Sequence, residues 1–173
     1  MKQKKYFTDE FPAEGDFVDN ESVDSVFKTK DTLLHYYLKN EWHKLASLDF
    51  LRDRILLNNY KNILSLGAGK CVLEYLLKVS LQPGHTVIAS DFVAFYIDKA
   101  KEFFPEITSV RFDFYKDNIK DLKTKLGINL DVAVFFGSAM AMDDEQVIDI
   151  LSGLKKSGVK EIIDFHQGKL NSI

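Results

Sequence analysis

The chain has 173 residues and is slightly acidic, with 23 basic and 26 acidic side chains and a net charge of −3. This balance gives no general electrostatic attraction to nucleic acid or to an anionic membrane surface. Cys71 is the single cysteine, which excludes an intrachain disulfide and a cysteine-rich metal site. With 46% hydrophobic residues, a chain of this length is expected to form one domain with a substantial core.

Residues 1–30 are predicted to form an acidic and aromatic arm that precedes the folded domain of residues 31–173. Residues 6–27 carry seven acids and neither lysine nor arginine, with several phenylalanines among them. The acids are typical of a solvated extension, whereas the aromatic residues favour a segment that docks as a flap over a ligand site. No long apolar run follows the basic start, so neither a signal peptide nor a membrane span is predicted and a cytoplasmic location is expected.

Two helices are expected between about residues 32 and 56, where apolar side chains recur at a spacing of three to four. After residue 60, predicted strands alternate with predicted helices. The strands are expected at 62–66, 86–90, 109–112, 130–136 and 161–165. The helices between them are expected at about 71–81, 93–104, 119–126 and 143–156.

This alternation predicts an α/β fold, a three-layer, doubly wound and mainly parallel sheet with helices on both faces. The 130–136 segment is almost wholly apolar, as expected for a strand that helices cover on both sides. In such sheets, ligands bind beyond the carboxyl ends of the strands, where the strand order reverses. The side chains that follow each strand are therefore the candidates for a functional site.

The first predicted strand runs directly into the glycine turn Gly67-Ala68-Gly69, and a predicted helix follows at once. Glycine allows positive φ and close approach of the backbone to a ligand, and the helix start presents free N–H groups. The turn therefore predicts a nucleotide-type ligand. A nicotinamide or flavin fingerprint places a third glycine where this chain has Val72, which weakens a dinucleotide hypothesis without removing it.

Acidic residues follow the second and third predicted strands, at Asp91 and Asp113. Asp91 is placed to accept hydrogen bonds from both hydroxyls of a ribose, although a strand-end aspartate is as often only a helix cap. Asp113 is placed to accept a hydrogen bond from an exocyclic amine such as that of adenine. The neighbouring Phe92 and Phe114 are either walls around a planar base or core residues.

Together these features resemble the class I S-adenosylmethionine-dependent methyltransferases, over about residues 45–166. Their first motif is an apolar strand followed by a variant of (Asp/Glu)-x-Gly-x-Gly-x-Gly, and this chain reads Ser65-Leu66-Gly67-Ala68-Gly69-Lys70-Cys71. Two glycines match, with serine in the acidic place and cysteine in the last glycine place. The family's fourth motif falls on Asp131 to Ser138.

The resemblance implies a Rossmann-like domain that binds S-adenosylmethionine and forms S-adenosylhomocysteine as product. It also implies that Asp91 holds the ribose and that Asp113 contacts the adenine. Ser65 can hydrogen-bond but cannot neutralise the cofactor's α-ammonium. The implied cofactor-binding residues follow four strands: Ser65, Gly67, Ala68, Gly69, Asp91, Phe92, Phe112, Asp113, Phe114, Phe136, Gly137 and Ser138.

The reaction implied is methyl transfer to an oxygen or nitrogen atom of a small-molecule acceptor. Adenine-methylating members carry (Asp/Asn)-Pro-Pro-(Tyr/Phe) where this chain has Phe136-Gly137-Ser138-Ala139, so methylation of DNA bases is not expected. His166, His35 and His43 are candidate bases, each weighed against a surface or structural role. Cys71 is either a reactive thiol at a helix start or a small residue in a glycine place. No metal-ligand cluster is visible in the sequence.

The family's full sheet has seven strands, with an antiparallel pair after the fifth, whereas this chain ends eight residues beyond Phe165. We therefore expect either a truncated or shortened member of the family, or a partner subunit or second copy that covers the incomplete sheet edge. The second hypothesis for function is accordingly a non-catalytic, methyltransferase-like subunit that binds a partner protein. A nicotinamide (NAD)-dependent oxidoreductase is the third.

Overall fold

A computed structural model describes residues 25–113 and 116–165, with only the backbone described at His43, Met140 and Ala141. Its centre is a five-stranded, all-parallel sheet in the order β3-β2-β1-β4-β5. The strands are β1 (Asn62–Leu66), β2 (Thr86–Asp91), β3 (Thr108–Arg111), β4 (Val132–Phe135) and β5 (Glu161–Asp164). The predicted doubly wound α/β fold is confirmed, and β1 lies at its centre.

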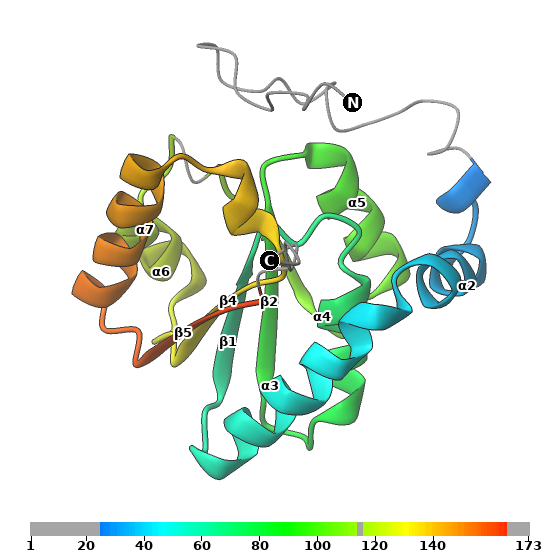
Figure 1. Ribbon diagram of the computed structural model, residues 1–173, viewed down its shortest axis with the longest axis horizontal. Helices are drawn as coiled ribbons and strands as arrows, with labels where there is room; N and C mark the ends of the chain where they lie inside the picture. Colours follow the sequence, from blue (N-terminus) through cyan, green and yellow to red (C-terminus); the bar gives the residue numbers. More distant parts are fainter. Residues whose placement is uncertain (1–24, 114–115, 166–173) are drawn as a thin grey trace, which may run out of the picture.

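The helices of the described residues form the two outer layers. They are α2 (Lys30–Asn40), α3 (Leu45–Leu57), α4 (Val72–Ser80), α5 (Ala94–Phe103), α6 (Ile119–Leu126) and α7 (Asp144–Lys156), with short 3-10 turns η2 (Trp42–Lys44) and η3 (Ser138–Ala141). Figure 1 shows α2 to α5 on one side of the sheet and α6 and α7 on the other. None of the described helices is both long and apolar enough to cross a membrane.

The core consists of two apolar layers, one on each face of the sheet. Alternation along β1 sends Ile63 into the layer under α3, α4 and α5, and Leu64 into the layer under α6 and α7. By the same alternation Ser65 faces α4. All three side chains are at most 1% exposed, so a polar group at position 65 lies inside the α4 layer.

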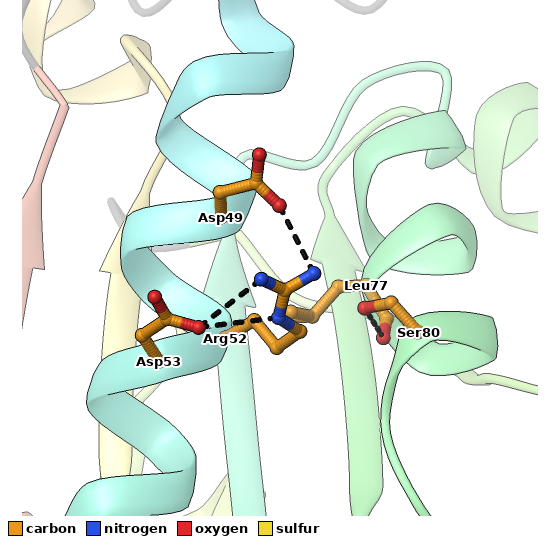
Figure 2. Close-up of polar contacts among 5 residues, drawn as sticks. All are labelled: Asp49, Arg52, Asp53, Leu77 and Ser80. Carbon is orange, nitrogen blue, oxygen red and sulfur yellow. Dashed lines mark hydrogen bonds and ion pairs between the residues drawn. The ribbon is translucent and has the colours of Figure 1, made fainter.

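The N-terminal helices pack on this same layer, with Leu33, Leu51 and Ile55 fully buried. Beside this buried contact, the surface of α3 carries an ion-pair cluster in which Arg52 contacts Asp49 at 3.0 Å and Asp53 at 3.1 Å. Figure 2 shows these side chains beside α4, where the Ser80 hydroxyl donates to the carbonyl of Leu77 at 2.8 Å. Ion pairs this exposed contribute little stability, so burial of the apolar stripe holds α3 in place.

A carboxylate fixes the amino-terminal ends of three strands. Asp131, directly before β4, accepts hydrogen bonds from the N–H groups of Lys61 (2.8 Å) and Asn62 (3.0 Å) at the start of β1. It also forms an ion pair at 2.7 Å with Lys160, which precedes β5. Burial alone would raise the pKa of Asp131, but these donors outweigh it and lower the pKa. The opposite end of the sheet holds the glycine turn.

The residues just before α2 belong partly to the predicted N-terminal arm. Phe27 is only 5% exposed, and its ring stacks on Tyr96 at 5.7 Å and meets Phe95 edge-on at 5.2 Å. Among the described residues of the arm, the aromatic residue Phe27 thus packs on α5. The rest of the arm, residues 1–24, lies outside the described residues.

Candidate functional site

The glycine turn forms the floor of the site at the carboxyl end of β1. Gly67 and Gly69 have φ of 69° and 54°, the left-handed region in which a side chain is strained. The Ala68 N–H donates to the carbonyl of Ser90 at 2.9 Å, which ties the turn to the end of β2. The turn therefore has the tight backbone that its two glycines predicted.

Cys71 occupies the third left-handed position of this turn and is the residue before the first turn of α4. Its φ is 57°, its side chain is fully buried, and its thiol contacts the Gly69 carbonyl at 3.3 Å. Burial, then the charges of Glu74 and Asp91, raise the pKa of the thiol. Of the two sequence interpretations, the structure favours the small residue in a glycine place over the reactive thiol.

Asp91 connects the turn to the start of α5. One of its carboxylate oxygens accepts from the Gly69 N–H at 2.8 Å, and the other accepts from the Val93 N–H at 2.9 Å. The side chain is 6% exposed. Nearby, burial and then the Asp91 charge raise the pKa of Tyr96. Asp91 thus holds Val93, the residue directly before α5, and at the same time anchors the glycine turn.

Under the turn, Ser65 pairs with an acidic residue that the sequence reasoning did not single out. The Ser65 hydroxyl donates to a carboxyl oxygen of Glu74 at 2.5 Å, and both side chains are 1% exposed. Glu74 lies in the first turn of α4, where a negative charge is favoured by the helix dipole. A carboxyl group therefore lies beside the position at which this chain has serine in place of the acidic residue of the motif.

The end of β4 approaches the end of β1 at the point where the strand order reverses. Gly137 has φ of 82°, and the Ser138 hydroxyl that follows donates to the Leu66 carbonyl. Phe136 stacks on Phe165, which follows β5, with ring centres 5.2 Å apart and planes 8° apart. The predicted residues Phe136, Gly137 and Ser138 are thus brought to the glycine turn from the other side of the switch point.

The end of β3 is less closely joined to this group. Phe112 is 3% exposed and belongs to the core layer under α6 and α7. Asp113 is partly buried, forms an ion pair with Lys116 at 3.2 Å, and donates its backbone N–H to Asp117 at 2.8 Å. Phe92 is partly buried, and its carbonyl accepts from the Arg111 guanidinium at 3.0 Å. Roles for these residues around an adenine stay predictions.

A cavity of about 270 Å³ opens at this end of the sheet, on the α6 side. Its walls come from the end of β3 and from the segment that leads into α6: Arg111, Phe112, Lys116, Asp117, Asn118, Asp121, Leu122 and Lys125. Neither Asp91 nor the glycine turn borders it. This cavity is therefore separate from the group of residues that Asp91 brings together.

On its α2 side, the turn carries a second charged residue that the sequence reasoning did not single out. Lys70 is partly buried, and its amino group lies 5.7 Å from the centre of the Tyr36 ring. Burial lowers the pKa of Lys70, and the nearby Glu41 works against this effect. A cation therefore stands at the outer side of the turn and a carboxyl group at the inner side.

The structure describes the side chain of one candidate base. His35 is exposed on α2, and the side chain of His43 is not described. His166, like Phe114 of the predicted base-binding wall, lies outside the described residues. The described residues also contain no cluster of three or more His, Cys, Asp or Glu side chains that could hold a metal ion.

A signal for Glu74 was present in the sequence. It shares with Leu77 and Leu81 the i, i+3, i+7 spacing of the buried stripe of a helix. An acidic residue on such a stripe must find a buried partner, and Ser65 is the polar residue of the strand beneath it. The interpretation of Ser65 by itself, without the helix above it, missed the pair.

Known proteins support the fold. No protein-family model and no curated protein sequence matches this chain. Among solved structures, a TehB-like S-adenosylmethionine-dependent methyltransferase from Corynebacterium glutamicum is 22% identical over 72% of this chain and 70% of its own length, with a TM-score of 0.50. Human N-acetylserotonin methyltransferase, solved in complex with S-adenosylmethionine, is 16% identical over 80% of this chain, with a TM-score of 0.53.

The plantazolicin methyltransferase BpumL, solved with S-adenosylhomocysteine, is 17% identical over 86% of this chain, also with a TM-score of 0.53. The match spans 38% of the human enzyme and 55% of BpumL. At these identities, the likeness concerns the fold. Together with the strand order, it shows that this chain has the Rossmann-like fold of the class I S-adenosylmethionine-dependent methyltransferases.

Proposed function

We propose that this domain binds S-adenosylmethionine at the carboxyl edge of β1, β2 and β4 and transfers its methyl group to a small-molecule acceptor. The observation that carries the proposal is the position of Asp91. Its carboxylate is hydrogen-bonded to Gly69 of the left-handed turn and to Val93 at the start of α5. This position between the two strand ends supports a contact of Asp91 with the ribose of an adenosyl ligand.

The structural neighbours support the ligand class. The human N-acetylserotonin enzyme was solved with S-adenosylmethionine and BpumL with S-adenosylhomocysteine. In the present chain, Gly67, Ala68 and Gly69 would lie against the ligand from the β1 side. Phe136, Gly137 and Ser138 would approach it from the β4 side, since Ser138 is hydrogen-bonded to the end of β1.

Methyl transfer from a sulfonium is chemistry that such an edge can support without a metal ion. The donor carbon is already activated, so positioning the acceptor in line with the sulfur and excluding water supply most of the rate. A base is needed only where the acceptor must lose a proton. His35, His43 and His166 remain the candidates for that role.

Calorimetric titration separates the candidate functions. We expect S-adenosylmethionine and S-adenosylhomocysteine to bind with one site per chain and NAD to bind much more weakly. Tight NAD binding without adenosyl-ligand binding would favour an oxidoreductase. Binding of none of the three would favour a non-catalytic subunit.

Asp91→Asn tests the ribose contact with a side chain of the same shape, which also gives up one of the two backbone hydrogen bonds that Asp91 accepts. Asn keeps an acceptor oxygen but loses the negative charge, so we expect S-adenosylhomocysteine affinity to fall roughly 10- to 100-fold, the usual worth of a charged hydrogen bond. Asp98→Asn, an exposed position on α5 that pairs with Lys101, is the matched control and should leave affinity unchanged. Equal affinity of Asp91→Asn and wild type would reduce Asp91 to a structural cap.

One observation favours the non-catalytic subunit as a second candidate. β5 forms the edge of the five-stranded sheet, and its Ile162 and Ile163 are only partly buried by the described residues. An edge strand with apolar side chains is a natural place for another chain to pair. Size-exclusion chromatography with light scattering, on wild type and on Ile163→Lys, tests whether a second copy binds there.

A further inference from the structure

Glu74 is a buried acid with an incomplete set of partners. One of its carboxyl oxygens accepts from the Ser65 hydroxyl at 2.5 Å. The other is inaccessible to solvent and has no hydrogen-bond partner among the described residues. An unpaired carboxylate oxygen inside a protein is costly, so its presence calls for an explanation, and a bound ligand is one that the chemistry of the site can test.

The titratable groups near Glu74 among the described residues do not supply that partner. Tyr37 of α2, Lys44 of η2, Cys71 of the turn and Asp91 of β2 interact with it electrostatically. Asp91 is a second acid, and Lys44 is already paired with Glu41 at 3.0 Å. Among the described residues, the region under the turn thus holds two carboxyl groups, and the neighbouring cation Lys44 is already engaged by Glu41.

The protonation of Glu74 follows from these surroundings. Burial raises its pKa from 4.5 to about 7, with the charge of Asp91 adding to the rise and the Ser65 hydrogen bond and Lys44 opposing it. Near neutral pH the side chain is therefore divided between a neutral acid and a carboxylate. A positive charge brought to the turn would favour the carboxylate.

We propose that Glu74 is the carboxylate that balances the ammonium group of the adenosyl ligand at the Gly67–Gly69 turn, and that it releases its proton to solvent when that ligand binds. The inference rests on the proposed function, because it assigns one end of the same ligand. Ser65, which occupies the acidic place of the motif, holds the Glu74 carboxyl in position through its hydroxyl. Ser65 and Glu74 together supply the negative charge for the ammonium group, which serine alone cannot provide.

The chemistry selects the ammonium among the ligand's charged groups. An ammonium has three N–H donors, whereas a sulfonium has none and cannot satisfy a carboxylate oxygen by hydrogen bonding. The ligand's own carboxylate would be repelled by Glu74 and Asp91, and Lys70 on the outer side of the turn is the cation available to it. The amino-acid arm would then lie with its ammonium toward α4 and its carboxylate toward Lys70.

The test compares two ligands that differ only in this arm. S-adenosylhomocysteine carries the ammonium and lacks the sulfonium, and 5′-methylthioadenosine lacks the whole amino-acid part. Both are titrated by calorimetry into wild type and Glu74→Gln at pH 6, 7 and 8. Each titration is repeated in phosphate and in Tris, because the difference in heat gives the number of protons released.

For wild type, we expect proton release when S-adenosylhomocysteine binds at pH 7. We also expect the ratio of the wild-type affinity to the Glu74→Gln affinity to be about tenfold higher at pH 8 than at pH 6. At pH 8, Glu74→Gln should bind this ligand at least about tenfold more weakly than wild type, since its side chain has the same shape but no charge. Its affinity for 5′-methylthioadenosine should match that of wild type, which also shows that the variant is folded.

Three outcomes would overturn the proposal. In the first, wild type and Glu74→Gln release the same number of protons. In the second, the substitution weakens both ligands by the same factor, which would assign Glu74 a structural role while leaving the proposed function intact. In the third, neither ligand binds wild type, and the proposed function fails together with this inference.

Discussion

The pair formed by Ser65 and Glu74 illustrates how a residue's role depends on the residue opposite it. Serine at the end of β1 would ordinarily be a neutral substitute for an acid. Here its hydroxyl donates to a carboxyl group from α4, so an acidic side chain is supplied by the helix instead of the strand. The cost is a buried, partly protonated carboxyl group whose second oxygen lacks a protein partner among the described residues.

The buried, partly protonated carboxyl group of Glu74 predicts that the stability of the fold depends on pH. Because the pKa of Glu74 is about 7 in the folded protein against 4.5 for an ordinary glutamate, the folded state binds more protons than the unfolded state between these values. The free energy of unfolding of wild type, relative to Glu74→Gln, should fall by roughly 3 kcal/mol as pH rises from 4.5 to 7 and then level off. Urea denaturation of both proteins across this range measures it. A constant difference would mean that Glu74 is not protonated in the folded state.

Cys71 predicts a chemical property of the same turn. Its thiol is buried and its pKa is raised, so it should react with iodoacetamide far more slowly in the folded protein than in urea. Mass spectrometry of the alkylated protein follows the reaction, and the denatured chain is the control. Rapid modification of the folded protein would revive the reactive-thiol interpretation.

At the scale of elements, the sheet is fixed at both ends by side chains that reach across strands. Asp131 joins the starts of β1, β4 and β5 at the end away from the site. Ser138 and Asp91 join the opposite ends of β4, β1 and β2. The strands are short, so these contacts align ends that few ladder hydrogen bonds would otherwise hold.

Asp131→Asn is therefore expected to destabilise the fold without touching the site. Loss of the charge weakens three hydrogen bonds, and we expect the free energy of unfolding to fall by about 1–3 kcal/mol at pH 7. Because the pKa of Asp131 is lowered from 3.8, the advantage of wild type persists above pH 4 and disappears as pH falls through the lower value. Thermal unfolding against Asp149→Asn, an exposed position on α7, measures the difference. Equal melting temperatures of the two variants at pH 7 would show that the contact contributes nothing.

At the scale of the whole molecule, one edge of the sheet collects the site and two apolar layers support it from either side. A ligand that binds only the folded state stabilises the entire domain. At one hundred times its dissociation constant, the gain is about 2.7 kcal/mol. For a domain of this size, that corresponds to a rise of roughly 5–10 °C in melting temperature. Scanning fluorimetry with S-adenosylhomocysteine measures the rise, and the Asp91→Asn variant should show little of it at the same concentration.

The sequence predicted the elements well where patterns are local. β1 and α6 begin and end at the predicted residues, and the other strands differ by one or two residues at their ends. The largest shift is in β4, which was expected over 130–136 and spans Val132–Phe135. The apolar run continues at both ends, but Asp131 turns its side chain to β1 and Gly137 leaves the strand at positive φ.

The site was predictable only in part, for a physical reason. Gly67, Gly69 and Asp91 follow strand ends, and parallel strands bring such positions together whatever the rest of the chain does. Glu74 and Lys70 depend on how α4 is rotated over the sheet and on where α2 lies. Packing of large apolar side chains such as Leu77 and Leu33 decides that rotation. The local pattern puts Glu74 on the buried stripe of α4, but it does not show which strand residue lies beneath it.

The hydrogen bond from Ser138, which follows β4, to Leu66 at the end of β1 joins residues 72 positions apart, and β1 and β4 pair at the centre of the sheet. Closing so long a stretch of chain carries an entropy cost, and only the interactions that form when β4 docks can offset it. A chain that ends after β3 would contain the glycine turn and Asp91, but it would lack the β4 side of the proposed ligand site. Under the proposed function, adenosyl-ligand binding should therefore report the docking of β4 in refolding experiments.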